Sequence, residues 1–429
     1  MYSQAKYLFY YRLYYVIRLG ERLYAYRPGL DRLPLLQALG TLGYHFFRLL
    51  RQPGLRLPQS GYSHFVFLET LNQKNAVIDV FELLPESQRQ SLLFAVSSKV
   101  SVTGYSHLLY SERYQFAWGL WYLPKAFALT RGYARSQRGV LNRTHVYVNM
   151  ALFLAAHRQF TQLLRASGVS RVVLTNDHNL QALALMLAAR DLQLPTYYIQ
   201  HAAVSEAFPM HLSHTALLEG QQALDVYQQL GILSRRIHLV GIPRLDGLLG
   251  IKTYTPGAPL TVGLCLKPYY SMELIVALLA AIRKASTVVE VVLRPHPGNT
   301  QGFYDTLADL GVRISNARLE RPQVFIQSVD VLLSGESSII LEAALLGVKT
   351  LYFDDGVAAY DLYGFVRNGI TEAVTLPEIP QRLEAKNITE TPSYFEACRY
   401  YCSTIGTPYA NRSKELILKY IGLEPIAND

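Results

Sequence analysis

The sequence predicts an α/β protein with two Rossmann-like, doubly wound domains that follow an N-terminal helical extension. Short apolar runs alternate with helical stretches of about 10–15 residues, which is the pattern of βαβ units in a parallel sheet. The alternation stops in a segment rich in glycine and proline at 247–260 and then restarts. The 429 residues are also enough for two or three domains, because single hydrophobic cores stop growing near ~250–300 residues.

Composition indicates a globular protein, with 50% hydrophobic and 17% charged residues. The formal net charge is +9, and residues 1–56 contribute +7 of it (nine Lys/Arg minus two Asp/Glu). A basic surface limited to one end of the chain argues against nucleic acid as a partner. Three cysteines are too few and too odd in number for a disulfide framework, which suits a reducing, cytoplasmic setting.

The first segment, residues 1–60, is expected to be a basic, tyrosine-rich helical extension. Tyrosine and arginine together are typical of helices at the membrane interface. Residues 1–56 therefore predict peripheral contact with the inner, anionic face of the membrane. A projection at 100° per residue, however, does not separate charged from apolar side chains in 6–22. A helical hairpin packed on the protein itself therefore remains an equal alternative. No signal peptide and no transmembrane run is expected.

The N-terminal domain is expected to span 61–247. Apolar runs predict its strands, and longer amphipathic stretches predict its helices. The expected strands are 64–69, 171–178 with its exit, 195–202, 214–220 and 236–243, and the expected helices are 74–83, 86–95, 113–136, 147–167 and 179–192.

A linker at 248–260 leads into a C-terminal domain at 261–405, and residues 406–429 form a last helix and tail. The second domain repeats the alternation of the first. Its expected strands are 261–268, 289–297, 312–315, 329–335 and 349–354, with helices up to about 285 and over 301–311, 337–346 and 408–421. Two such domains would place a cleft between the carboxyl ends of their strands, where ligands bind in open α/β sheets.

The stretch "VVLRPHPGNT" places Arg294 and His296 at the end of a buried strand. Proline fixes φ and cannot donate to a ladder, so Pro295 and Pro297 end the strand and hold His296 in one direction. A solvated arginine and an unspecific loop histidine are the alternative interpretation of this stretch.

A second strand exit, in "VDVLLSGESSIILEAALLGVKTLYFD", carries Ser334, Gly335, Ser337 and Ser338. A helix that starts there would offer unpaired N–H groups, Gly335 would allow close backbone approach, and the hydroxyls would donate to phosphate oxygens. Glu342, one turn further, could reach a ribose hydroxyl or be an ordinary glutamate, just as the serines could be helix caps.

In the N-terminal domain, "TNDH" and "QH" place Asp177 and His201 at neighbouring strand exits. Either side chain is a candidate general base for an acceptor hydroxyl. Asp177 could instead cap the helix that follows, and His201 could be a hydrogen-bonded loop histidine. For Arg244, in "VGIPRLD", an ion pair near the linker is expected.

"RPHP" after a strand, followed about 40 residues later by "SGESS" at a helix start, resembles GT-B-fold transferases. It is most similar to the CDP-glycerol glycerophosphotransferase (teichoic acid polymerase) group and to bacterial CMP-sugar transferases of the sialyl and Kdo types. The resemblance covers about 170–355. It implies that Arg294, His296, Ser337 and Ser338 hold the donor phosphates. It also implies that "YYIQHAAVSEAFP" delivers His201, although here Ala202 follows where the polymerases have glycine.

The expected function is therefore metal-independent transfer of a sugar or polyol phosphate from a CMP- or CDP-linked donor to a glycan or lipid-linked acceptor. The resemblance implies no cofactor besides this nucleotide-activated co-substrate. The lack of an Asp-x-Asp stretch agrees with metal independence; Asp354-Asp355 is the nearest approach to one. Two alternatives stay open: a sugar-nucleotide 2-epimerase of the same fold, and a non-catalytic scaffold that binds nucleotide sugars.

Overall fold

The structure is a computed structural model. It describes residues 55–425 except 99, 137–139, 207, 209, 233, 251–258, 357–359 and 386–390. The helical extension expected over 1–60 lies outside the described residues up to residue 54, and most of the expected linker lies outside them too. None of the helices in the described part of the chain is both long enough and apolar enough to span a membrane.

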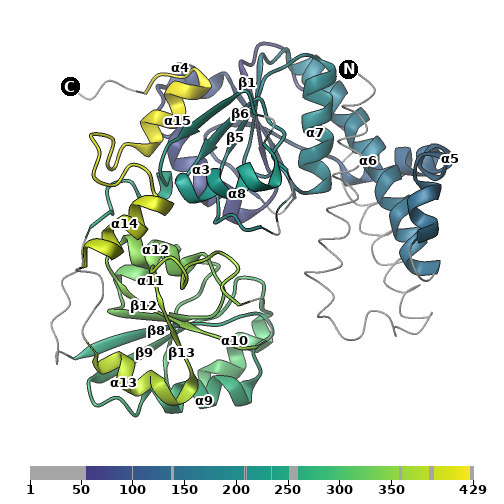
Figure 1. The fold of residues 1–429 in the computed structure, drawn as a ribbon. Helices are drawn as coiled ribbons and strands as arrows, with labels where there is room; N and C mark the ends of the chain where they lie inside the picture. The colour runs from purple at the N-terminus through teal and green to yellow at the C-terminus, as the bar shows by residue number, and fades with distance from the viewer. Residues whose placement is uncertain are drawn as a thin grey trace.

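The first domain is built on a sheet of seven parallel strands in the order β3-β2-β1-β4-β5-β6-β7 (Figure 1). The central strands are apolar on both faces, as strands covered by helices on both sides must be. The strands are β1 (His64–Leu68), β2 (Leu92–Val96), β3 (Ser106–Leu109), β4 (Arg171–Leu174), β5 (Thr196–Ile199), β6 (Thr215–Leu218) and β7 (Arg236–Leu239).

Helices cover both faces of this sheet, with one hydrophobic core on each side. The first core contains α5 (Glu112–Ser136), α6 (Val140–Ser167), α7 (Leu180–Asp191) and α8 (Gln221–Leu230). The second contains α3 (Leu71–Phe81) and, from the far end of the chain, α15 (Ser413–Ile421).

The second domain has six parallel strands in the order β10-β9-β8-β11-β12-β13. The first six strands of the other sheet are arranged in the same way, so both domains have the doubly wound order 3-2-1-4-5-6. The strands are β8 (Leu260–Cys265), β9 (Val288–Arg294), β10 (Arg313–Ile314), β11 (Val331–Ser334), β12 (Lys349–Phe353) and β13 (Glu372–Val374).

Two cores again cover the two faces of the second sheet. On one face lie α9 (Met272–Ile282), α10 (Gln301–Ala308) and α13 (Ile379–Glu384). On the other lie α11 (Pro322–Gln327), α12 (Ile339–Leu345) and α14 (Pro392–Tyr401). The fold class predicted from the sequence, two doubly wound α/β domains, is confirmed.

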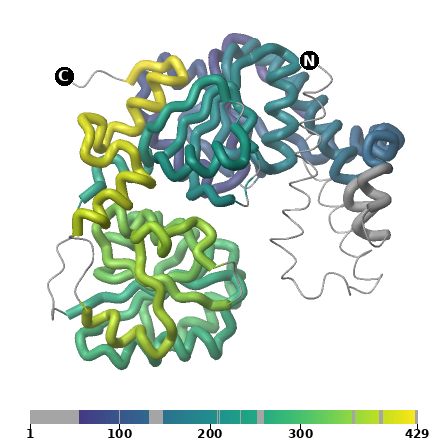
Figure 2. Tube along the Cα trace, in the orientation of Figure 1, coloured from purple at the N-terminus to yellow at the C-terminus, as the bar shows by residue number. Residues whose placement is uncertain are grey.

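The chain returns to the first domain at its C-terminal end, as the yellow tube in Figure 2 shows. α14 lies between the domains, and the carbonyl of Glu219 after β6 accepts a hydrogen bond of 3.0 Å from the N–H of Ser403. Three residues of the first domain, Ala203, Ile242 and Leu245, belong to the core of the second. The two domains therefore share a continuous apolar contact.

Several elements differ from those expected from the sequence. The helix expected over 86–95 is wrong: α4 (Glu86–Gln90) is short, and strand β2 follows it directly. The run "LLFAV" is buried at every position, so it shows no period, and a short apolar run of this kind does not reveal whether it is helix or strand. The strands β3 and β13 and the helices α8, α11, α13 and α14 were not expected.

Candidate functional site

The order of both sheets reverses between two neighbouring strands, β1 and β4 in the first sheet and β8 and β11 in the second. Outside the carboxyl ends of two such strands is where ligands bind in doubly wound folds. In the first domain Glu69 and Thr175 follow these strands, and in the second Lys267 and Gly335 lie just beyond them. The chemistry of the site should therefore be sought in these exits and their neighbours.

Lys267 lies in the centre of the exits of the second sheet. A Cβ atom on Gly335 would lie 3.4 Å from Lys267 Cε and 3.4 Å from Asp355 Oδ2, which shows how closely the three residues approach. Burial lowers the pKa of Lys267, while the carboxylates of Glu336 and Asp355 act in the opposite direction. The ammonium group is thus half-buried beside carboxylates at the reversal point of the sheet.

His296 is exposed at the next strand exit, and its ring orientation is fixed by the backbone. The N–H of Gly298 donates to His296 Nδ1 over 3.0 Å. Because Nδ1 accepts this bond, the proton of the neutral ring is on Nε2, which can donate to a ligand. Burial, and then the positive charge of Lys267, lower the pKa of His296. The direction that Pro295 and Pro297 were expected to impose is thus supported by a backbone hydrogen bond.

The serines of the other exit differ in exposure. Ser334 ends strand β11 and is buried, whereas Ser337 and Ser338 are half-buried. Ser338 precedes α12 without capping it through its side chain. Gly335 has a close neighbour, since a Cβ there would lie 2.7 Å from the hydroxyl of Tyr270. The hydroxyls of Ser337 and Ser338 can thus contact a ligand, whereas the glycine at 335 makes room for the side chains of Tyr270, Asp355 and Lys267.

Arg294 does not lie where the sequence suggested. The residue is 5% exposed, and its guanidinium donates to Ser315 Oγ at 2.5 Å and to the carbonyl of Glu320 at 2.9 Å. The Glu320 carboxylate lies 3.3 Å away, and the ring of Phe325 packs against the guanidinium. Burying a charge requires such partners. Arg294 therefore fastens β9 to the segment after β10, and a donor phosphate would have to compete with these bonds.

Glu342 is also engaged elsewhere than at a ribose. Arg244 lies between two carboxylates, with Nη1 2.5 Å from Glu219 Oε1 and Nε 3.0 Å from Glu342 Oε1. The other oxygen of Glu342 accepts from Gln323 at 2.9 Å. Burial raises the pKa of Glu219 although Arg244 counteracts this shift. The ion pair expected for Arg244 is thus present, and it joins the two domains.

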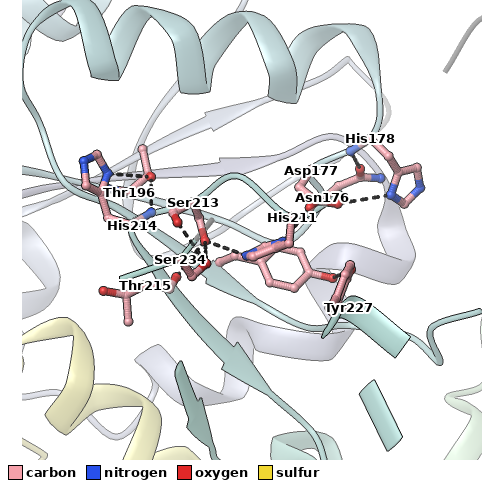
Figure 3. Close-up of polar contacts among 11 residues, drawn as sticks. Asn176, Asp177, His178, Thr196, His211, Ser213, His214, Thr215, Tyr227 and Ser234 are labelled. Carbon is pink, nitrogen blue, oxygen red and sulfur yellow. Dashed lines mark hydrogen bonds and ion pairs between the residues drawn. The ribbon is translucent and has the colours of Figure 1, made fainter. Parts of the chain in front are cut away.

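Asp177 is fully buried, and Figure 3 shows why. Its Oδ2 lies 2.6 Å from Nδ1 of the buried His211, whose Nε2 lies 2.6 Å from Ser213 Oγ. The hydroxyl of Ser213 also donates to the carbonyl of Thr215 at 2.9 Å. Since Ser213 is 1% exposed, this Asp-His-Ser row presents no nucleophile. It fixes the loop before β6, so the carboxylate of Asp177 is not placed to serve as a base.

His201, the other candidate base, has an orphaned nitrogen. Its Nδ1 is buried without a hydrogen-bond partner in the part of the chain that the structure describes, as is Oγ1 of Thr175 at the end of β4. Burial, and then the positive charges of His178 and Arg244, lower the pKa of His201 to about 4. The ring is therefore neutral at pH 7, and its lowered pKa makes it a weaker base than an ordinary histidine until a nearby negative charge raises that pKa.

Lys267 is the residue that sequence reasoning missed, although the sequence held a signal. "LCLKP" has a form similar to "VLRPHP": an apolar run that leads into a basic residue followed by proline. Register places the two strand ends level, because Cys265 pairs with Arg294 and Ser334 pairs with Cys265. Among the described residues, no group of three or more His, Cys, Asp or Glu side chains is arranged to hold a metal ion.

No protein-family model and no curated protein matches the sequence. Solved structures do match its fold. The calicheamicin glycosyltransferase CalG4 is 14% identical with a TM-score of 0.52, over 84% of this chain and 98% of that one. The UDP-GlcNAc 2-epimerase from Neisseria meningitidis bound to UDP-GlcNAc is 13% identical with a TM-score of 0.52, over 83% and 98%. The wall teichoic acid polymerase TagF is 11% identical with a TM-score of 0.49, over 84% and 89%.

The predicted GT-B fold is thus confirmed, since CalG4 shares this two-domain architecture over nearly its whole length. Glycosyltransferases and 2-epimerases are equally similar to the chain. Similarity at such low identity concerns the fold alone, so function has to be argued from the side chains.

Proposed function

We propose that the protein is a glycosyltransferase, or a polyol-phosphate transferase, that uses a nucleotide-activated donor. The donor is expected to be CMP- or CDP-linked, and the acceptor is a glycan or lipid-linked molecule. Lys267 and His296 would hold the donor phosphates together with the hydroxyls of Ser337 and Ser338. His201 would remove the proton of the acceptor hydroxyl.

The observation that carries the proposal is the position of Lys267. An ammonium group sits beside Gly335 at the reversal point of the second sheet, with the Nε2–H of His296 one strand away. Phosphate oxygens need such donors, and the glycine at 335 lets the ammonium-bearing side chain of Lys267 lie close to the backbone at this strand exit. Arg294 and Glu342, which the resemblance or the spacing had placed at the donor, act in this proposal as supports of the site.

The acceptor side favours transfer over epimerisation. Transfer to a hydroxyl needs one base, whereas epimerisation requires that a proton be removed from carbon and another returned. Two carboxylates at the exits of the first sheet, Asp177 and Glu219, are occupied by His211 and Arg244. His201 keeps a neutral ring whose buried Nδ1 has no hydrogen-bond partner among the described residues, and an acceptor hydroxyl that reached this ring would need only the one deprotonation that transfer requires. A bound nucleotide would add negative charge nearby and so strengthen this base.

A nucleotide panel followed by product analysis tests the proposal. CMP, CDP, UMP, UDP and GDP are compared by thermal shift, because a ligand at 100 times its Kd stabilises the fold by ~2.7 kcal/mol. The matching nucleotide sugar is then incubated with and without acceptor. We expect stabilisation by CMP or CDP and release of the nucleotide only with acceptor. A free 2-epimer would establish the alternative enzyme, and binding without turnover would establish the scaffold.

A lysine pair provides the matched control for the donor site. Lys267→Met should abolish nucleotide stabilisation, whereas Lys284→Met, which alters an exposed lysine of the same domain, should leave it unchanged. Equal stabilisation of both variants would contradict the assignment of Lys267.

A further inference from the structure

The helices α5 and α6 form the outer layer of the first domain. In Figure 1 α6 lies beyond α7, and α5 lies outermost. The beginning of α5 is held by polar contacts: the hydroxyl of Tyr114 donates to Gln162 at 2.6 Å, and the amide of Gln115 donates to Gln159 at 2.8 Å. Residues 120–131 of the helix, by contrast, are mostly exposed on the outside of the molecule.

The outward-facing side of residues 120–128 is apolar and aromatic. Leu120 is 56% exposed, Trp121 75% and Phe127 51%. At 100° per residue they lie on the other side of the helix from the buried Ala126 and Thr130, and exposed Pro124 and Ala128 extend the same side. The exposed α5 face is therefore made of Leu120, Trp121, Pro124, Phe127 and Ala128. Soluble proteins rarely leave a contiguous patch of this kind in water unless it binds something.

The two helices that carry the exposed α5 face have a strongly positive net charge. The two helices carry seven Lys/Arg and one acidic residue, Glu112, which gives +6. A second copy of the hairpin would bring an equal charge onto the face, and residues 1–56 carry +7 themselves. Both would be repelled, so the charge points to an anionic occupant. The basic residues are Arg113, Lys125, Arg131, Arg135, Arg143, Arg158 and Arg165.

We propose that the α5–α6 hairpin docks on an anionic lipid surface, with the exposed α5 face entering the headgroup region. Tryptophan prefers that region because its ring is apolar and its N–H remains wet. The surrounding cations add attraction to anionic headgroups. The inference does not depend on the proposed transferase function, and it concerns a different surface from residues 1–56.

Both tryptophans of the chain lie on α5, which makes the proposal directly testable. Trp118 is half-buried and stacks under Arg158, whose Cζ is 3.8 Å from its ring centroid. In a full-length Trp118→Phe variant the emission then reports on Trp121 alone. We expect a blue shift, and quenching by brominated lipid, with vesicles of phosphatidylcholine and phosphatidylglycerol but not with phosphatidylcholine alone. Salt should reverse both effects.

Co-sedimentation with the same vesicles measures the contribution of the face. Trp121→Ser/Phe127→Ser should bind at least about tenfold more weakly, since interfacial binding scales with buried apolar area. Leu319→Ser/Val289→Ser, which removes two side chains with 85% and 68% exposure in the other domain, should bind like the wild type. The four side chains are exposed, so circular dichroism should show intact folding for both variants.

Three results would overturn the proposal. The full-length protein could ignore anionic vesicles at low salt. It could bind them without any change in Trp121 emission, in which case residues 1–56 or another surface makes the contact. It could also prove to be a dimer that the Trp121→Ser/Phe127→Ser variant dissociates, as light scattering would show, and the occupant would then be a second copy.

Discussion

The carboxyl ends of the two sheets carry similar residues but hold them differently. In the first domain two carboxylates are already paired: Asp177 is bound to His211, and Glu219 is bound to Arg244. In the second domain Lys267 is half-buried beside a glycine, and His296 is exposed with its Nε2–H available. A polar residue at a strand exit therefore becomes a ligand-binding group only when its neighbours leave it unused.

The difference has a physical reason in the contact between the domains. The exits of β5 and β7 lie where Ala203, Ile242 and Leu245 join the core of the second domain, and the exit of β6 lies between these two strands. Charges in such a place lose water and must find partners inside the protein. On the side of the first domain, Asp177, His211, Glu219 and Arg244 therefore form a fixed set of paired charges, which we call the buried frame. His201 lies beside the buried frame without belonging to it. On the side of the second domain, Lys267 and His296 remain available as hydrogen-bond donors.

The substitution expected to change activity most is at His201, the proposed base. His201→Gln should lower kcat by about 10²–10⁴-fold, the usual contribution of a general base, while the melting temperature changes little. His107→Gln, which alters an exposed histidine of the same domain, should keep full activity. If Asp177→Asn abolished turnover and His201→Gln did not, Asp177 would be the base and His201 would have only a structural role.

The next effect concerns the buried frame. Arg244→Met leaves Glu219 and Glu342 buried without their cation, which should cost about 3–5 kcal/mol of the free energy of unfolding. Arg321 provides the matched control, because it also joins the domains, through Asp79 at 3.1 Å, but its side chain is 56% exposed. Arg321→Met should cost only about 0–1 kcal/mol. Urea unfolding measures both, and equal losses would mean that Arg244 is not an essential part of the buried frame.

Most of the fold could be predicted from the alternation of apolar runs and helical stretches in the sequence. It placed β1, β4, β8, β9 and β11 within a few residues of their bounds, because buried parallel strands are unbroken apolar runs. It failed at β2, where the preceding short helix and the apolar run merged into one expected helix. It could not reveal that α15 returns to the first domain, since such packing joins residues more than 300 positions apart: His64 Nε2 lies 3.0 Å from the carbonyl of Ile421.

The candidate site was only partly visible in the sequence. His296, Ser337 and Ser338 lie at the expected edge, because strand exits in a parallel sheet are level. Arg294 and Lys267 had the same local pattern, yet Glu320 and Ser315 occupy the arginine. These partners come from the segment after β10, and the sequence around Arg294 does not contain them. Local pattern locates an edge, but tertiary contacts decide which charge stays available.

A smaller effect is expected in the pH dependence of activity. His201 has a pKa of about 4 in the folded protein, against about 6.5 for an ordinary histidine. Its neutral form therefore persists on the acid side, and kcat/KM should stay level from pH 7 to about pH 5 and fall only near pH 4. A fall centred near 6.5 would show that the base is not shielded as the structure indicates.

The same shift implies a change of stability with pH, whose sign follows from proton uptake. Between about pH 6.5 and pH 4 the unfolded state binds a proton at residue 201 that the folded state does not, so stability decreases as the pH falls through this window. His201→Gln removes this contribution. Urea titrations at several pH values should show a shallower decrease for the variant than for the wild type.

The smallest expected effect is none: activity should persist in excess EDTA. The acidic pair at the exit of β12, the nearest approach to a metal-binding stretch, has other roles. Asp354 accepts the N–H of Gly356 at 2.9 Å, and Asp355 accepts the hydroxyl of Tyr269 at 3.0 Å, so the pair shapes its loop. Lys267 would balance part of the donor's phosphate charge, and the Nε2–H of His296 would donate a hydrogen bond to it, where a divalent ion would otherwise act. Loss of turnover in EDTA that Mg²⁺ or Mn²⁺ restores would instead mean that these two donors need a metal ion beside them.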